Sequence, residues 1–74
     1  MNFIEIDVRE MAPPEPMTAI LSALSSLPKD AGLQVHHSRQ PYPLYDKLMA
    51  AGWDYQCEKM SENYFLLLIF RPQA

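Results

Sequence analysis

The seven residues from Tyr64 to Phe70 are all apolar, and this run constrains the fold more than any other feature of the sequence. It is too short to be a membrane helix, which needs about 20 residues. A strand that is apolar on both faces typically lies inside a sheet, between strands that alternate apolar and polar side chains. The run therefore predicts a central strand, and the rest of the chain must supply its neighbours.

Three other segments alternate in the way expected of half-buried strands. They cover residues 3–8, 33–38 and 53–60. A loop over residues 61–63 joins the last of these to the apolar run, and Asn63 can adopt the positive φ that such hairpins use. The alternation predicts these side chains on the inner faces of the three strands: Ile4, Ile6 and Val8; Leu33, Val35 and His37; Trp53, Tyr55 and Cys57.

Two helices are predicted between the strands. Apolar side chains recur at helical spacing from residue 17 to residue 27, after a proline-rich segment over residues 11–16 that suits a first helical turn. A shorter helix over residues 44–51 follows Pro43, and Gly52 suits its left-handed end. The apolar stripe of the first helix consists of Met17, Ile20, Leu21, Leu24 and Leu27.

The predicted order is βαβαββ in one domain over residues 1–74. The first two strands are joined by a helix and should be parallel through a right-handed crossover, whereas the last two form a hairpin. We therefore predict an α+β two-layer sandwich, with a mixed four-stranded sheet and both helices on one face. The open face should carry Leu66 and Leu68, or Phe65 and Leu67, and is a candidate partner surface.

Charge and cysteine content exclude several classes of function. Six Lys and Arg against nine Asp and Glu give a net charge of −3, which argues against non-specific nucleic-acid binding. The first residues lack a basic segment, so we expect no signal peptide, no membrane partner and a cytoplasmic location. A single cysteine excludes an internal disulfide. His36 and His37 are adjacent on a strand and point to opposite faces, so we predict no metal site.

The segment from Ile6 to Pro16 resembles the opening motif of the TusA/SirA sulfur-carrier family, which reads hydrophobic-D-x-R-G-L-x-C-P-x-P. Residues 36–45, followed by residues 52–55, resemble a second signature. That signature belongs to an uncharacterised branch of TusA-like domains without the sulfur-carrying cysteine. The resemblance covers the whole chain and implies the same mixed sheet with two helices on one face.

The resemblance places a proline where the sulfur carriers hold a persulfide. When Arg9, Pro14 and Pro16 are aligned with the motif, Pro13 takes the position of the cysteine. A helix N-terminus lowers the pKa of a thiol at that position, but proline cannot carry sulfur. The resemblance therefore implies a scaffold without its nucleophile. Cys57, in another strand, is expected to be a small buried residue, and sulfur transfer through Cys57 is the alternative.

The predicted fold brings three basic side chains to one edge of the sheet. Arg9 and the pair His37 and Arg39 follow two parallel strands, and open α/β sheets bind ligands at that edge. Both helices begin there, and helix N-termini attract anions. We therefore predict a site for a small anion at Arg9, His37 and Arg39. The alternative is a set of ion pairs with Glu10 and Glu15 that joins the two loops.

The most economical hypothesis is a non-catalytic binding or accessory module that acts through this edge on a small anion or a protein partner. Two alternatives remain: a sulfur-transfer protein that uses Cys57, and a structural partner of a redox enzyme. The sequence predicts no catalytic residue and no cofactor.

Overall fold

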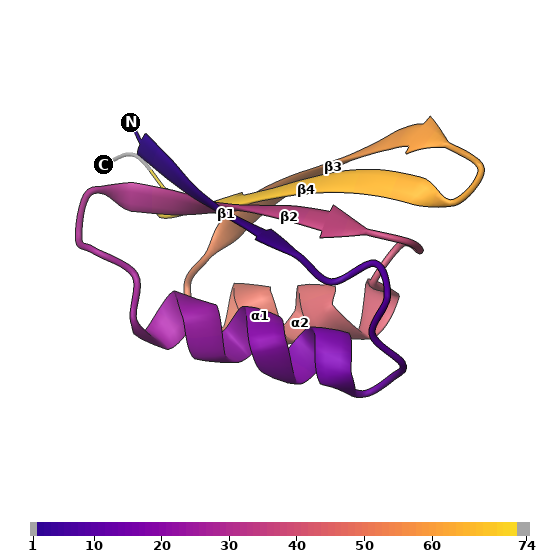
Figure 1. Ribbon diagram of the computed structural model, residues 1–74. Helices are drawn as coiled ribbons and strands as arrows, with labels where there is room; N and C mark the ends of the chain where they lie inside the picture. The colour runs from indigo at the N-terminus through magenta and orange to yellow at the C-terminus, as the bar shows by residue number, and fades with distance from the viewer. Residues whose placement is uncertain (1, 73–74) are drawn as a thin grey trace.

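The computed structural model describes residues 2–72 and confirms the predicted element order (Figure 1). The four strands form one mixed sheet in the order β1-β2-β4-β3. Strands β1 and β2 are parallel, and β4 runs antiparallel to both β2 and β3. The elements are β1 (Asn2–Asp7), α1 (Glu15–Ser25), β2 (Ala31–His37), α2 (Tyr42–Ala50), β3 (Asp54–Ser61) and β4 (Tyr64–Phe70).

The apolar strand β4 lies in the interior of the sheet, as predicted. Its inner side chains Leu67 and Ile69 are fully buried, and they lie opposite Val35 and Leu33 of β2. Its other face carries Leu66 and Leu68, which are half-buried on the open side of the sheet. Of the two alternatives for the open face, the structure therefore selects Leu66 and Leu68.

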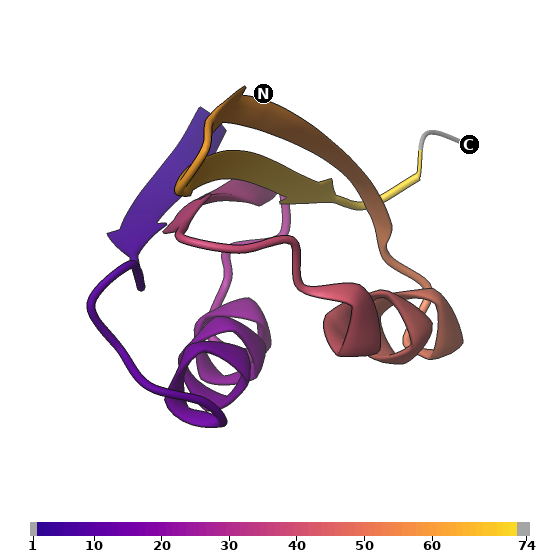
Figure 2. The same cartoon turned by 90° about the vertical axis from the view of Figure 1, so that its right-hand side faces the viewer.

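Both helices cover the same face of the sheet (Figure 2). Helix α1 packs against β2 and helix α2 packs against β3, so the core is a single layer between helices and sheet. Because a chain this small has a thin core, each of these side chains makes a large contribution to stability. The fully buried side chains of this core are Val8, Ile20, Leu33, Val35, Leu44, Leu48, Leu67 and Ile69.

Helix α1 has Glu15 in its first turn, as predicted, whereas α2 starts two residues earlier than predicted. Helix α1 begins at Glu15, with Pro16 inside its first turn, and α2 begins at Tyr42, with Pro43 in its first turn. The first amides of a helix have no intrahelical acceptor, so a proline is tolerated there. Gly52 has a φ of 85° and follows α2, as expected of a left-handed end.

The hairpin between β3 and β4 corrects one prediction. Ser61 pairs with Tyr64, so the turn is the two residues Glu62 and Asn63 rather than three, and no residue other than glycine has a positive φ within residues 2–72. The predicted positive φ at Asn63 is wrong. A β-bulge between Lys59 and Ser61 supplies the additional twist that a left-handed turn residue would otherwise provide.

Candidate functional site

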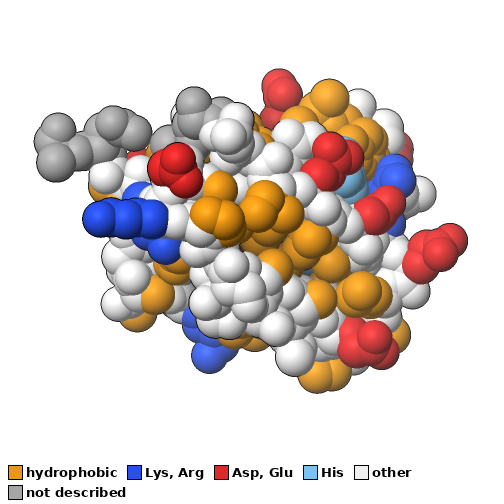
Figure 3. All heavy atoms as spheres, turned by 60° about the vertical axis from the view of Figure 1, so that its left-hand side comes forward, with side chains coloured by type: hydrophobic (Ala, Val, Ile, Leu, Met, Phe, Trp, Pro, Cys, Tyr) orange, Lys and Arg blue, Asp and Glu red, His pale blue; other side chains and the backbone are white. Residues whose placement is uncertain are grey.

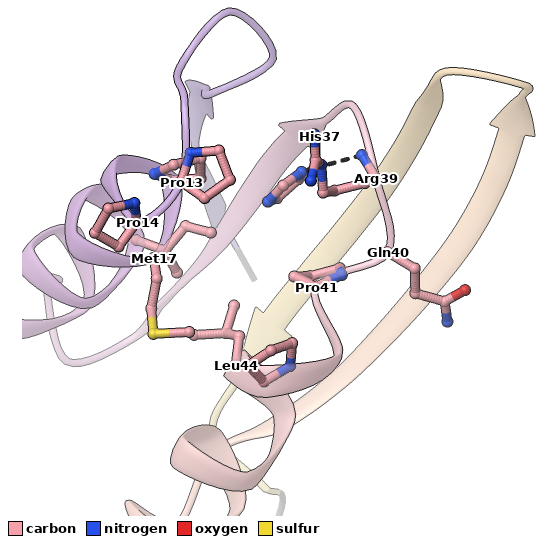
Figure 4. Close-up of a pocket in the computed structure, with 11 residues that line it drawn as sticks. Pro13, Pro14, Met17, His37, Arg39, Gln40, Pro41 and Leu44 are labelled. Atoms are coloured by element: carbon pink, nitrogen blue, oxygen red, sulfur yellow. Dashed lines mark hydrogen bonds between the residues drawn. The ribbon is translucent and has the colours of Figure 1, made fainter.

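A groove of about 320 Å³ lies between the first turns of the two helices, at the edge where the sequence analysis placed a ligand (Figure 4). This volume is at the lower end of the range for small-molecule sites. The walls come from the loop before α1, the start of α1, the end of β2 and the loop into α2. The residues that line the groove are Pro13, Pro14, Pro16, Met17, Ile20, His37, Arg39, Gln40, Pro41, Pro43 and Leu44.

His37 is the buried polar side chain of the groove, with 4% of its surface exposed. The backbone N–H of Arg39 donates to its Nδ1 over 3.2 Å, which assigns the ring proton to Nε2 in the neutral form. Burial, and then the charge of Arg39, lower the pKa of His37 below its usual value of 6.5. Within residues 2–72, Nε2 has no hydrogen-bond partner, so His37 offers the groove an unused N–H donor.

Arg39 supplies positive charge at the rim of the groove. The residue is exposed, and among residues 2–72 its guanidinium takes part in no ion pair. The ion pairs that the sequence analysis offered as an alternative, from Arg39 to Glu10 or Glu15, are absent from this part of the chain. The guanidinium is therefore available to an anionic group that enters beside His37.

The helix ends contribute fewer amide donors than two helix N-termini usually offer. Pro16 and Pro43 have no N–H, and neither helix has a side-chain cap. The amides of Glu15 and Leu44 already donate to carbonyls of the preceding loops. The dipoles of both helices still favour a negative charge at this end of the groove.

Arg9 does not join His37 and Arg39. Its guanidinium makes two close contacts with the carboxylate of Asp7, at 2.7 Å from Nη2 and 3.0 Å from Nε, and it lies 4.9 Å from the centre of the Tyr64 ring. Hydrogen bonds from Arg9 lower the pKa of Asp7 to about 2. Asp7 and Tyr64 belong to the open face of the sheet, so the structure separates Arg9 from the groove.

The open face holds a cluster that the sequence analysis did not find. His36 donates from Nε2 to Glu5 over 2.6 Å, and its Nδ1 is 2.7 Å from the hydroxyl of Tyr64. A carboxylate only accepts hydrogen bonds, so Nε2 carries a proton, and in the neutral form of the ring Tyr64 donates to Nδ1. The pairing of β1 with β2 brings Glu5 and His36 close, and sequence alternation alone places both on the same face.

Cys57 lies outside the groove. It is half-buried on β3, opposite the fully buried Leu67, and it packs against the edge of the core. Tyr45 of α2 lies nearby, stacked on Tyr55 at 4.2 Å between ring centres, and its buried hydroxyl has no hydrogen-bond partner among residues 2–72. Burial raises the pKa of Tyr45. Cys57 thus occupies an environment of aromatic and aliphatic side chains.

Two further classes of site can be assessed within residues 2–72. No three His, Cys, Asp or Glu side chains in this part of the chain gather closely enough to hold a metal ion. Neither α1 nor α2 has the length and apolar character that crossing a membrane would require.

Comparison with known proteins gives a family but no named activity. No curated protein and no solved structure matches the chain. A family described as an uncharacterized conserved protein, DUF2249, matches residues 5–71, which include the end of β1, the other five elements and every residue of the groove. The chain therefore belongs to the DUF2249 family of uncharacterized conserved proteins.

Proposed function

We propose that the protein is a non-catalytic binding module and that its groove takes a small organic acid with an apolar body. One observation carries this proposal: His37 is buried at an otherwise apolar groove and keeps an N–H donor that no described side chain uses. Nε2 is not sealed from solvent, so water can accept from this N–H in the free protein and a ligand acceptor can replace that water.

The groove walls determine the body of the ligand. Prolines, Met17, Ile20 and Leu44 present carbon atoms over most of the lining, and rigid proline rings lose little conformational freedom when a ligand binds. Apolar contact contributes about 25 cal/mol for each Å² of buried surface. The ligand therefore needs a compact aliphatic or aromatic group to fill this part of the groove.

The polar end of the groove determines the charged group of the ligand. The N–H of His37 and the guanidinium of Arg39 are both donors, and both helix dipoles favour negative charge there. A carboxylate has two acceptor oxygens and can meet both side chains. The lowered pKa of His37 keeps the ring neutral near pH 7, so Arg39 supplies the full positive charge.

An inorganic anion fits this site less well than an organic acid does. Anion sites at helix N-termini depend on several free backbone amides, and here Pro16 and Pro43 remove two of them. A phosphate or sulfate ion would also leave the apolar walls in contact with water. We therefore refine the small anion predicted from the sequence to an amphipathic one.

The relationship to the TusA/SirA sulfur carriers is part of this proposal. Pro13, at the position that the resemblance assigns to the sulfur-carrying cysteine, is one of the groove walls. A ring at this position adds apolar surface to the groove and cannot react. On this hypothesis, a site that handles sulfur in the carriers binds an intact small molecule here.

Sulfur transfer through Cys57 has less support. A reactive thiol needs exposure and a cationic neighbour, whereas Cys57 is half-buried on the core side of β3. A persulfide on Cys57 of the purified protein, detected by intact-mass spectrometry, would favour this alternative over a binding module. No specific contact in the structure favours a structural role beside a redox enzyme.

The proposal can be tested with paired fragments and amide chemical shifts. The probes are small aromatic and branched aliphatic carboxylates, each paired with its neutral amide, and inorganic phosphate. We expect the carboxylates to shift the amides of His37, Arg39 and Leu44 with saturation, the neutral amides to bind more weakly, and phosphate to cause no saturable shift. The proposal is wrong if no carboxylate shifts these amides, or if the shifts fall on the open face around His36.

A further inference from the structure

The two outer strands of the sheet differ in how well their edges are protected. Strand β3 has a β-bulge at residues 59–61 and carries Lys59, two features that discourage further strand pairing. Strand β1 has neither: residues 2–7 pair regularly with β2 and contain no lysine, proline or bulge. Within residues 2–72, nothing pairs with the outer edge of β1.

The backbone of β1 presents a row of hydrogen-bonding groups to solvent. The N–H of Val8 donates to His36 O over 2.9 Å, so Val8 directs its backbone polar groups toward β2. Alternate residues of a strand direct these groups to opposite sides, so Phe3 and Glu5 direct theirs outward. Water satisfies these groups in the free chain, and among protein segments an extended strand is the one that can pair with the whole row.

Apolar side chains flank this free backbone. Ile4 is 43% exposed on the helix side of β1, and Leu21 of α1 is 36% exposed. Phe3, on the open face, lies back over β2: its ring atom Cε1 is 2.5 Å from the position that a Cβ on Gly32 would take. The Phe3 ring therefore adds apolar surface beside the edge without covering it.

The two ends of β1 differ in net charge, although side chains of both signs lie at each end (Figure 3). Basic side chains lie near the start of the strand, where Arg71 donates to the carbonyl of Lys29. Near its end, three carboxylates outnumber one guanidinium in a single depression, which is lined by Asp7, Arg9, Glu10 and Glu15. Figure 3 shows the hydrophobic side chains between these two ends. An antiparallel arrangement of two copies would bring the basic end of each beside the acidic end of the other.

We propose that two copies of the chain pair through β1 in an antiparallel, twofold-symmetric way, with Ile4 facing Ile4 of the second copy. In this register Phe3 and Glu5 of each copy exchange backbone hydrogen bonds with Glu5 and Phe3 of the other. Of the two neighbouring symmetric registers, the one centred on Phe3 pairs fewer residues of β1, and the other places Glu5 opposite Glu5, where like charges destabilise a strand pair. The sheet then continues across the twofold axis as eight strands.

The experiment combines sedimentation equilibrium with engineered cysteines. We expect the 74-residue chain to dimerise reversibly. Ile4→Lys should raise the dimer dissociation constant at least about tenfold, because it places two positive charges opposite each other at the twofold axis. Met60→Lys, at an exposed position of the β3 edge, is the matched control and should leave the constant unchanged. A circular dichroism melt of each variant verifies folding.

Cysteine cross-linking tests the register, and it does so even if Ile4→Lys fails to fold. In a Cys57→Ala background, Ile4→Cys should form a disulfide dimer under mild oxidation, because facing residues of a non-hydrogen-bonded pair have Cα atoms about 4.5 Å apart. Glu5→Cys should form no such disulfide, because each Glu5 faces Phe3 of the other copy and the two positions 5 are diagonal neighbours, about 7–8 Å apart. A chain that stays monomeric at millimolar concentration, a dimer unaffected by Ile4→Lys, or equal cross-linking at both positions would overturn the proposal.

Discussion

The two histidines at the end of β2 differ in how completely their hydrogen bonds are used. On the open face, His36 has both ring nitrogens occupied, one by Glu5 and one by Tyr64. On the helix face, His37 has one nitrogen occupied by the backbone of its own loop and the other free at an apolar groove. Adjacent residues of one strand therefore belong to a polar cluster on one face and to an apolar groove on the other.

The arginines follow the same division. Arg9 on the open face is held by Asp7 and stacks on Tyr64, whereas Arg39 at the groove has no ion pair within residues 2–72. Side chains that satisfy one another stabilise a surface, while unsatisfied donors beside an apolar cavity favour a ligand. The comparison indicates that the polar side chains of the open face satisfy one another, whereas those at the groove keep free donors within residues 2–72.

The largest expected effect concerns stability on the helix face. Leu24→Ala removes a side chain that is 5% exposed and should lower the free energy of unfolding by about 2–5 kcal/mol, enough to unfold a domain of this size. Leu68→Ala, on the half-buried open face, should cost about 1 kcal/mol. Urea denaturation measures both. Equal losses of unfolding free energy in Leu24→Ala and Leu68→Ala would contradict the difference in packing between the two faces.

The next effect concerns ligand binding. Arg39→Ala should weaken the binding of a groove carboxylate by about 1–3 kcal/mol, because a hydrogen bond to a charged group contributes about that much. Arg9→Ala is the control from the open face and should leave the affinity unchanged. Titration calorimetry with the best carboxylate fragment measures both variants. A loss of affinity in Arg9→Ala comparable to that in Arg39→Ala would place the site elsewhere.

A third prediction uses pH to sharpen the comparison between the histidines. Burial lowers the pKa of His37 in the folded state, so below pH 6.5 the unfolded chain binds more protons than the folded one at this residue. The contribution of His37 to stability is therefore complete above pH 6.5 and is lost as the pH falls below it, by at most about 1.4 kcal/mol per pH unit.

The variant His37→Gln should remove this part of the pH dependence, whatever its effect on stability at pH 7. Urea denaturation at several pH values between neutral and mildly acidic provides the measurement. An unchanged slope in His37→Gln would mean that other groups cause the dependence and that His37 titrates as an exposed histidine does.

The fold could be predicted from the sequence because its pattern is mostly local. The apolar run of β4 identifies an interior strand, and the alternation of β2 places Leu33, Val35 and His37 on the core side. The hairpin was predicted less well, because the bulge near Lys59 depends on strand pairing rather than on the turn residues. The start of α2 was misplaced by two residues, since a proline fits the first turn of a helix at more than one position.

The site could be predicted only in part, because sequence order does not fix which charges meet. His37 and Arg39 lie at the predicted edge, on one short segment after β2. Arg9 was expected beside them, but Asp7 is two residues away and captures its guanidinium. Long side chains reach either face from the end of a strand, and the nearest opposite charge decides between them.

The smallest effect distinguishes two tyrosine hydroxyls. Tyr64 donates to His36 on the open face, so Tyr64→Phe should lower the free energy of unfolding by about 0.5–1.5 kcal/mol. The hydroxyl of Tyr45, on the helix side, is buried and has no partner among residues 2–72. Folding therefore removes this hydroxyl from water without giving it a hydrogen bond, and Tyr45→Phe removes that cost. Tyr45→Phe should therefore be neutral or stabilising. Urea denaturation of the two variants under identical conditions gives both values. A larger loss of unfolding free energy in Tyr45→Phe than in Tyr64→Phe would show that the Tyr45 hydroxyl makes a hydrogen bond in solution. It would also show that the bond between Tyr64 and His36 contributes little to stability.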